Sequence, residues 1–247
     1  MNRLTVLAAA VAAIAVPAFA QMRMAKPAAG SRTKGESTVK IKIDHMPKPG
    51  EALVAAPVFQ AQVAGNLQPA INKRPRKWAL FELRYSTSED WVDELTFTWH
   101  VLAQAEKSEL NKSRKAAARE SAGEGGNVKA TVTPYSYYTT AVRYVNIPRG
   151  SHMACVGLPP STVEHFGRPV CVSVEITDKN GKSLEIRTEE TMNISRADPN
   201  AKGRWWESET IMNNRNANAK VERRNGLLDR SKTPFALINS SDYENAE

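Results

Sequence analysis

Every second residue from 95 to 101 is large and apolar, while the residues between them are Thr or His. On an extended backbone this period of two puts the apolar side chains on one face and the polar ones on the other. A helix would instead scatter both kinds around its axis. Alternating or β-branched segments recur at residues 39–43, 78–87, 129–140, 142–147, 170–176, 184–186 and 235–238. The sequence therefore predicts an all-β fold, an antiparallel sandwich of seven or eight short strands.

The segments between these strands predict turns, long loops and one short helix. Residues 178–181 read DKNG, which is a strong hairpin turn. After two prolines, Ser161 and Glu164 form a capping box and Gly167 can end the helix. Residues 106–127 are charged and Ala-rich, so they form either a short exposed helix or a long mobile loop. The number and spacing of the strands are those of immunoglobulin-like sandwiches.

The first residues have the layout of a secretory signal peptide. A basic start at Arg3 precedes an apolar run, and residues 18–20 (AFA) form a cleavage site. We expect a Sec signal peptide at 1–20, a flexible linker at 21–36 and a single domain at 37–247 with a loop-rich C-terminal part. The apolar run is too short for a transmembrane helix. The expected location is therefore the periplasm, the outer membrane surface or the extracellular space.

The basic residues do not indicate a nucleic-acid partner. The net charge is +8, but Lys and Arg are interleaved with Asp and Glu except at 73–77 and 112–119. A nucleic-acid binder would concentrate these charges on one element. An exported basic protein is better suited to anionic envelope surfaces or acidic glycans, and solubility alone also explains the charge.

Two cysteines, Cys155 and Cys171, enclose a segment of 17 residues. Pairing is the default in an oxidising compartment, so the sequence predicts a disulfide. Such a loop contributes roughly 3 kcal/mol in the chain-entropy model. The alternative is two free thiols.

The signal peptide and the sandwich pattern occur together with two short segments, residues 144–150 (YVNIPRG) and 157–160 (GLPP). This combination resembles a family of secreted, pilus-associated proteins from mucin-dwelling Verrucomicrobia. The resemblance implies an immunoglobulin-like domain, similar to archaeal-type pilus components, that is exposed at the cell envelope. It transfers no functional residues to this chain.

No catalytic motif is present in the sequence. The four histidines lack metal-ligand spacing, and the chain has no Cys-x-x-Cys, nucleophile elbow, phosphate-binding glycine loop or dinucleotide fingerprint. We therefore expect no catalytic residue, no metal site, no cofactor and no enzymatic activity. A hydrolase with catalytic residues on distant strands is the less favoured alternative.

Aromatic side chains are the candidate binding residues. Exposed Tyr and Trp rings stack on sugars and anchor protein interfaces, whereas the alternative is packing over a sandwich edge. The candidates are Tyr135, Tyr137, Trp205 and Trp206.

The segment formed by Phe235, Ala236, Leu237 and Ile238 is a candidate strand for pairing. It can close the domain or be donated to a neighbour, because strand addition supplies backbone hydrogen bonds. The leading hypothesis is an exported, non-enzymatic structural or adhesive module with protein partners in a surface or pilus-like assembly. The alternative is a glycan (mucin)-binding module that uses the Tyr and Trp residues.

Overall fold

The computed structural model describes residues 39–57, 62–63, 66–67, 75–124, 134–201, 203–213 and 221–238. The expected signal peptide (1–20) and linker (21–36) lie outside the described residues. Within the described part, no helix is long and apolar enough to cross a membrane.

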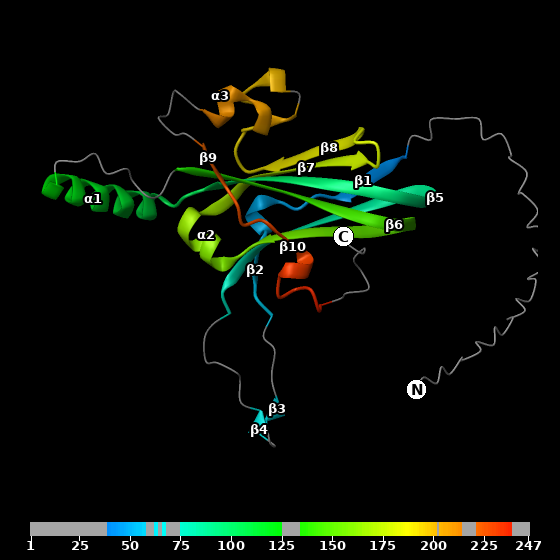
Figure 1. Ribbon diagram of the computed structural model, residues 1–247, viewed down its shortest axis with the longest axis horizontal. Coiled ribbons are helices and arrows are strands. Elements are labelled where there is room, and N and C mark those ends of the chain that lie inside the picture. Colours follow the sequence, from blue (N-terminus) through cyan, green and yellow to red (C-terminus); the bar gives the residue numbers. More distant parts are fainter. Residues whose placement is uncertain are drawn as a thin grey trace, which may run out of the picture. The chain divides into compact units, whose positions relative to one another are not determined.

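The fold is mostly β (Figure 1). The main sheet has the order β10-β6-β5-β7-β8, with β1 and β2 also paired to β5 and β9 to β6. All pairs are antiparallel except β6 with β9. The strands are β1 (Ile41–His45), β2 (Leu53–Ala55), β3 (Gln62–Val63), β4 (Asn66–Leu67), β5 (Lys77–Gln104), β6 (Tyr135–Leu158), β7 (Arg168–Asp178), β8 (Ser183–Glu190), β9 (Val221–Arg224) and β10 (Leu228–Asp229). The helices are α1 (Lys107–Glu124), α2 (Pro160–Phe166) and α3 (Glu209–Met212), with 3-10 turns η1 (Pro49–Glu51), η2 (Pro199–Ala201), η3 (Trp205–Glu207) and η5 (Arg230–Lys232).

Strands β5 and β6 are long and fold back on themselves. Tyr85 and Phe97 both belong to β5, yet their ring centroids are 4.9 Å apart. In a straight strand, residues twelve positions apart would be separated by roughly 40 Å. The β5–β6 register shifts between Thr87 and Trp91. Opposite this shift β6 carries Gly150 at φ 141°, so the bend lies at this position.

The bend creates two layers. The first layer contains β1, β2, β10, residues 77–87 of β5 and residues 150–158 of β6. The second layer contains residues 91–104 of β5, residues 135–148 of β6, and β7, β8 and β9. The predicted class, an all-β sandwich, is confirmed. The strands predicted at 78–87 and 95–101 are the two halves of β5.

The main core lies between the two layers. Its largest fully buried members come from both halves of β5 and from β6 and β7: Phe81, Leu83, Tyr85, Leu95, Phe97, Trp99, Tyr138, Ile147, Leu158 and Ile176. The period-two face at 95–101 is therefore the core face, as predicted. Val39, Ile41 and Ile43 pack against the same core.

Two predicted connections differ in their details. Residues 107–124 form a helix, which decides between the helix and the loop that the sequence left open. The short helix α2 begins at Pro160 with Pro159 as its N-cap, so the predicted Ser161 cap is wrong. Glu164 is not part of a capping box, because its carboxylate binds the guanidinium of Arg76.

Gly167 ends α2 with φ 102°, as predicted. A Cβ at this position would overlap the backbone carbonyl of Gln104, so only glycine fits there. The DKNG turn is also confirmed, because Asp178 Oδ1 accepts hydrogen bonds from the Asn180 N–H at 2.8 Å and the Lys182 N–H at 2.9 Å.

The predicted disulfide is wrong, because both cysteines are free and buried. Cys155 pairs across β6–β5 with Glu82, so it lies on the outer face of the first layer, between the core residues Ala154 and Val156. Cys171 lies on the outer face of the second layer, where it pairs with Leu102. The main core therefore separates the two thiols. Burial raises the pKa of both thiols, which makes them unreactive.

We expect no reactive thiol in the native protein and two after denaturation without reductant. The melting temperature should be the same with and without reductant, because no bond links the cysteines. Thiol titration and thermal unfolding measure these outcomes. A denatured, unreduced protein that shows no thiol would contradict the structure.

The predicted strand from Phe235 to Ile238 is also wrong, because these residues form a turn. The Phe235 ring packs edge-on against Trp78 with a centroid distance of 6.1 Å. This contact turns the chain back onto the first layer, so residues 235–238 do not extend the sheet.

Candidate functional site

Residues 191–201 and 203–213 cover the outer face of the second layer, and we call this segment the cap. It contributes Trp205, Trp206, Ile211 and Met212 to a second buried cluster, separate from the main core. The sheet side of this cluster is formed by Leu102, Tyr137, Val170, Cys171 and Val221. The cap is therefore fastened to the sheet by an apolar interface of its own.

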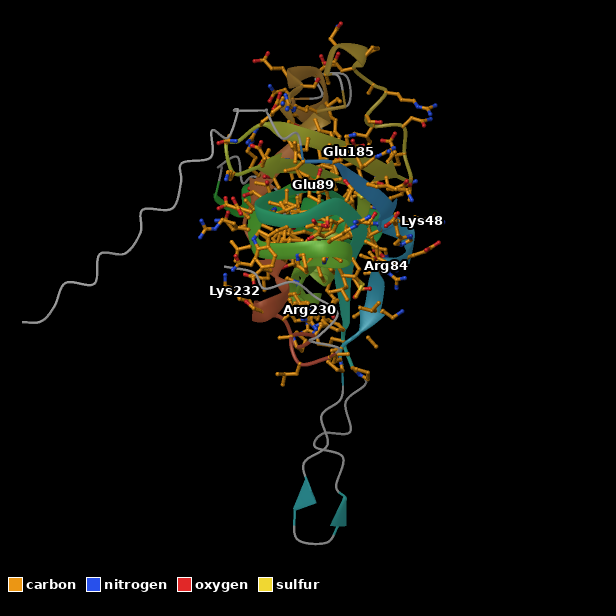
Figure 2. The ribbon with its side chains drawn as sticks, turned by 90° about the vertical axis from the view of Figure 1, so that its right-hand side faces the viewer. Lys48, Arg84, Glu89, Glu185, Arg230 and Lys232 are labelled. Atoms are coloured by element: carbon orange, nitrogen blue, oxygen red, sulfur yellow. The ribbon has the colours of Figure 1, made fainter. Side chains whose placement is uncertain are left out.

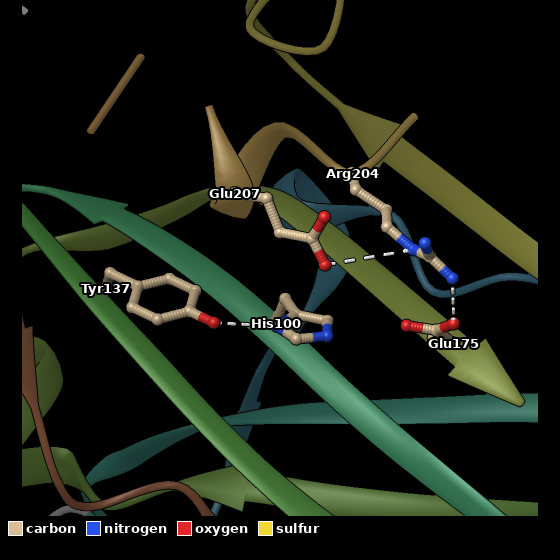
Figure 3. Close-up of polar contacts among 5 residues, drawn as sticks. All are labelled: His100, Tyr137, Glu175, Arg204 and Glu207. Atoms are coloured by element: carbon tan, nitrogen blue, oxygen red, sulfur yellow. Dashed lines mark hydrogen bonds and ion pairs between the residues drawn. The ribbon is translucent and has the colours of Figure 1, made fainter. Parts of the chain in front are cut away.

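His100 lies at the centre of the polar contacts under the cap (Figure 3). Its ring stacks on Trp206 with a centroid distance of 3.7 Å and an interplanar angle of 6°. Its Nδ1 forms a 2.7 Å hydrogen bond with the Tyr137 hydroxyl. Its Nε2 is buried and has no hydrogen-bond partner among the described residues.

Trp205 is held by a second polar contact. Its indole Nε1–H donates a 2.7 Å hydrogen bond to Ser173 Oγ, which is itself 2.7 Å from Thr188 Oγ1. The polar atom of this buried indole is therefore satisfied, and its position on the sheet is fixed.

An ion-pair cluster lies beside His100. The Arg204 guanidinium donates to Glu175 at 2.6 Å and lies 3.9 Å from Glu207 (Figure 3). Burial opposes ionisation of Glu175, but hydrogen bonds from Ser183 and Arg204 and the positive charge of Arg204 lower its pKa overall. Arg204 therefore ties the cap to β7.

Burial lowers the pKa of His100 to about 4, with the Arg204 charge acting in the same direction and Glu175 opposing it. His100 is thus neutral at physiological pH. Tyr137 likewise has a raised pKa because it is buried. The His100 ring is buried under the Trp206 indole, so this stack joins the sheet to the cap.

Three of the four predicted aromatic residues do not offer a ring to a ligand. Tyr137, Trp205 and Trp206 are 3%, 0% and 6% exposed. Of the two alternatives that the sequence left open, packing over the sheet applies to these three residues, because their rings bury its outer face. Tyr135 is half-buried, and its hydroxyl accepts a 3.2 Å hydrogen bond from the Gln104 side chain.

A pocket of about 350 Å³ opens to solvent between the cap and the edge of the second layer. Tyr135 is the predicted residue that lines it. The wall consists of Leu102, Tyr135, Met192, Asn193, Ile194, Ala197, Thr210, Ile211 and Val221. Its size is at the lower end of ligand pockets, which span about 300–1,000 Å³.

The sequence did not indicate His100, Glu175 or Arg204 as a cluster. His100 was visible only as a polar residue opposite the core face at 95–101, and its partners come from β6, β7 and the cap. Among the described residues, no group of three or more His, Cys, Asp or Glu side chains could hold a metal ion.

No protein-family model and no curated protein match this chain. A crystal structure from Akkermansia muciniphila is similar to it, with a TM-score of 0.54 over 85% of this chain and 93% of that chain. The sequence identity is 19%, so the similarity concerns the fold alone. This chain therefore shares a β-rich fold with a protein of that bacterium.

Proposed function

We propose that this protein is an exported, non-enzymatic structural or adhesive module that acts through protein contacts in a surface assembly. The open edge of β8 is the observation that carries the proposal. The secretory layout of residues 1–20 and the resemblance to pilus-associated proteins of Verrucomicrobia support the cellular location. The fold shared with a protein of Akkermansia muciniphila agrees with that family.

Strand β8 (Ser183–Glu190) ends the order of the main sheet and, within the described part of the chain, pairs with β7 alone. It is eight residues long. Alternate N–H and C=O groups of such a strand point away from the sheet and can accept a partner strand. Figure 2 shows Glu185 of this strand in the upper part of the view, above Glu89 of β5.

The side chains that most resemble catalytic groups have a structural use. His100 stacks on Trp206, Ser173 accepts from Trp205, and Glu175 binds Arg204. All three contacts join the sheet to the cap. This use supports a structural role for the outer face of the second layer.

Two proline variants test the proposal. The N–H groups of neighbouring residues point to opposite sides of a strand, so Arg187→Pro and Thr188→Pro remove one donor toward β7 and one toward the open edge. The variant that loses the N–H directed toward β7 should have a lower melting temperature, because a hydrogen bond between β8 and β7 is lost. The other variant should keep the melting temperature of its alanine counterpart, Arg187→Ala or Thr188→Ala, and lose association with the surface fraction of the producing bacterium. The alanine counterpart is needed because Thr188 also contacts Ser173 through its side chain.

The matched controls are Arg187→Ala and Thr188→Ala, which keep the N–H and should keep the surface association of the unmodified protein. The measurements are thermal unfolding and immunoblotting of sheared surface, envelope and cytoplasmic fractions. Recovery of the unmodified protein in the cytoplasm would contradict the proposal. So would full surface association of both proline variants.

A further inference from the structure

The open edge of β8 presents the hydrogen-bonding groups of particular residues. The Thr191 N–H donates to the Val170 carbonyl at 2.9 Å, one position beyond the last β8–β7 pair. In an antiparallel ladder, residues that bond the neighbouring strand alternate with residues whose N–H and C=O point the other way. By this alternation, the N–H and C=O groups of Ile186 and Thr188 point away from β7 and toward the open edge.

Two opposite charges lie on either side of Ile186, on one face of this edge. The partners of Glu185 and Arg187 on β7 are core residues, Ile176 and Val174, so both charged side chains lie on the face of β8 that is turned toward the core. They still reach solvent at the edge, because the side chains are 32% and 59% exposed. Within the chain, Arg187 Nε lies 2.8 Å from the Glu185 carboxylate.

Two copies of β8 can pair about a two-fold axis only if one residue lies opposite its own copy. Hydrogen-bonded and non-hydrogen-bonded pairs alternate along the ladder, so an axis between two successive pairs would exchange unlike pairs. With Ile186 on the axis, Glu185 of each copy lies opposite Arg187 of the other copy. This register therefore forms two cross-strand pairs of opposite charge.

The two neighbouring registers bring like charges together. With Arg187 on the axis, the two copies of this arginine face each other and Glu185 faces Glu189. With Glu185 on the axis, two glutamates face each other. Like charges that are directly opposite destabilise a strand pair, so both registers are disfavoured.

Registers with Thr188 or Leu184 on the axis avoid like charges but overlap the strands less. The overlap is limited to residues 186–190 and 183–185, whereas the axis at Ile186 overlaps all but one residue of β8. A longer overlap forms more backbone hydrogen bonds. Charge and backbone pairing therefore favour the same register.

We propose that β8 of one copy pairs antiparallel with β8 of a second copy about a two-fold axis at Ile186, which joins the two main sheets into one. The inference rests on the proposed role of the β8 edge and names its partner. Because the Ile186 N–H and C=O point to this edge, the two copies of Ile186 exchange hydrogen bonds. The Glu185–Arg187 pairs are then non-hydrogen-bonded pairs, in which facing side chains lie closest. The contact is closed, so the product is a dimer that does not grow further.

Charge reversal tests this register. Arg187→Glu and Glu185→Arg each turn both facing pairs into like charges, so each variant should need about tenfold higher concentration for half-dimerisation. Both side chains reach solvent, so circular dichroism and the melting temperature should stay unchanged. Sedimentation velocity of the purified protein over a concentration series measures the dimerisation. A neutral replacement such as Arg187→Ala removes attraction without adding repulsion, so reversal is the sharper change.

Two combinations of these changes are the matched controls. In an equimolar mixture of Arg187→Glu and Glu185→Arg, each facing pair across a mixed dimer is again one arginine and one glutamate. The mixture should therefore dimerise as the unmodified protein does, although neither variant does so alone. The double variant Glu185→Arg/Arg187→Glu restores both pairs between identical chains and should also dimerise.

Four results would overturn the inference: an unmodified protein that is monomeric at concentrations up to about 1 mM, oligomers larger than a dimer, single variants that dimerise normally, or a mixture that dimerises no better than its components. A monomeric protein whose Thr188→Pro variant still loses surface association would leave the proposed function intact, with a different protein as the partner of β8. A dimer that is recovered in the cytoplasm would contradict the proposed function alone.

Discussion

Replacing Trp205 by Ala will lower the free energy of unfolding by about 3–5 kcal/mol, the cost usual for a large aromatic side chain removed from a core. Trp205 is fully buried and packs edge-on against Tyr137 and Trp206, with centroid distances of 5.7 and 5.8 Å. Its loss also leaves Ser173 without the indole donor. Equilibrium denaturation with urea measures the change.

The effect should be concentrated in the cap. The main core contains no residue of 191–213, so the sandwich can keep its packing when the cap is released. Hydrogen exchange should therefore accelerate in the cap of Trp205→Ala, while β5 and β6 remain protected. Trp91→Ala is the matched control, because Trp91 is 55% exposed and its removal should change stability by less than about 0.5 kcal/mol. Equal losses in the two variants would contradict the role assigned to the cap.

Acidification from pH 7 to pH 4 will cost about 3 kcal/mol of stability through His100 alone. The pKa of His100 falls from its ordinary value of 6.5 to about 4 in the folded chain because the ring is buried. Between these two values the unfolded chain binds a proton that the folded chain excludes. The contribution of His100 is therefore complete above pH 6.5, declines as the pH falls and is lost at about pH 4.

His100→Gln isolates this contribution, since a neutral amide can face the Tyr137 hydroxyl but does not titrate in this range. Glu175 also acts on His100 and gains protons on acidification, whereas Arg204 and Tyr137 keep their charge state. The Glu175 carboxylate is common to both proteins. The stability difference between wild type and His100→Gln should therefore change by about 3 kcal/mol from pH 7 to pH 4. A measured His100 pKa close to 6.5 would contradict the prediction.

Features that depend only on residues close together in the sequence, such as the faces of a strand and a tight turn, were predictable. The apolar face at 95–101 is the core face because strand geometry alone places alternate side chains on one side. The same geometry explains why Cys171 lies on the face opposite Val172 and Val174. The DKNG turn was predictable because an Asp side chain can bind the backbone two and four residues later.

Contacts between residues that are distant in the sequence were not predictable. Periodicity says which way Cys155 and Cys171 point along their strands, but not that the bend in β5 and β6 puts them on opposite outer faces. Strand β9 pairs in parallel with β6, although residues 213–224 are mostly Asn, Arg and Lys.

The candidate site shows the same division. The sequence by itself determined the strand segments at 39–43, 78–87, 95–101 and 170–176 and the core face at 95–101, because backbone geometry and local polarity suffice for these. Only the tertiary structure decided that Trp205 and Trp206 are buried and that Tyr135 lines a pocket. The reason is that a cap about a hundred residues from His100 in the chain covers the sheet. Burial of a side chain is a property of what packs against it, and no local pattern encodes that partner.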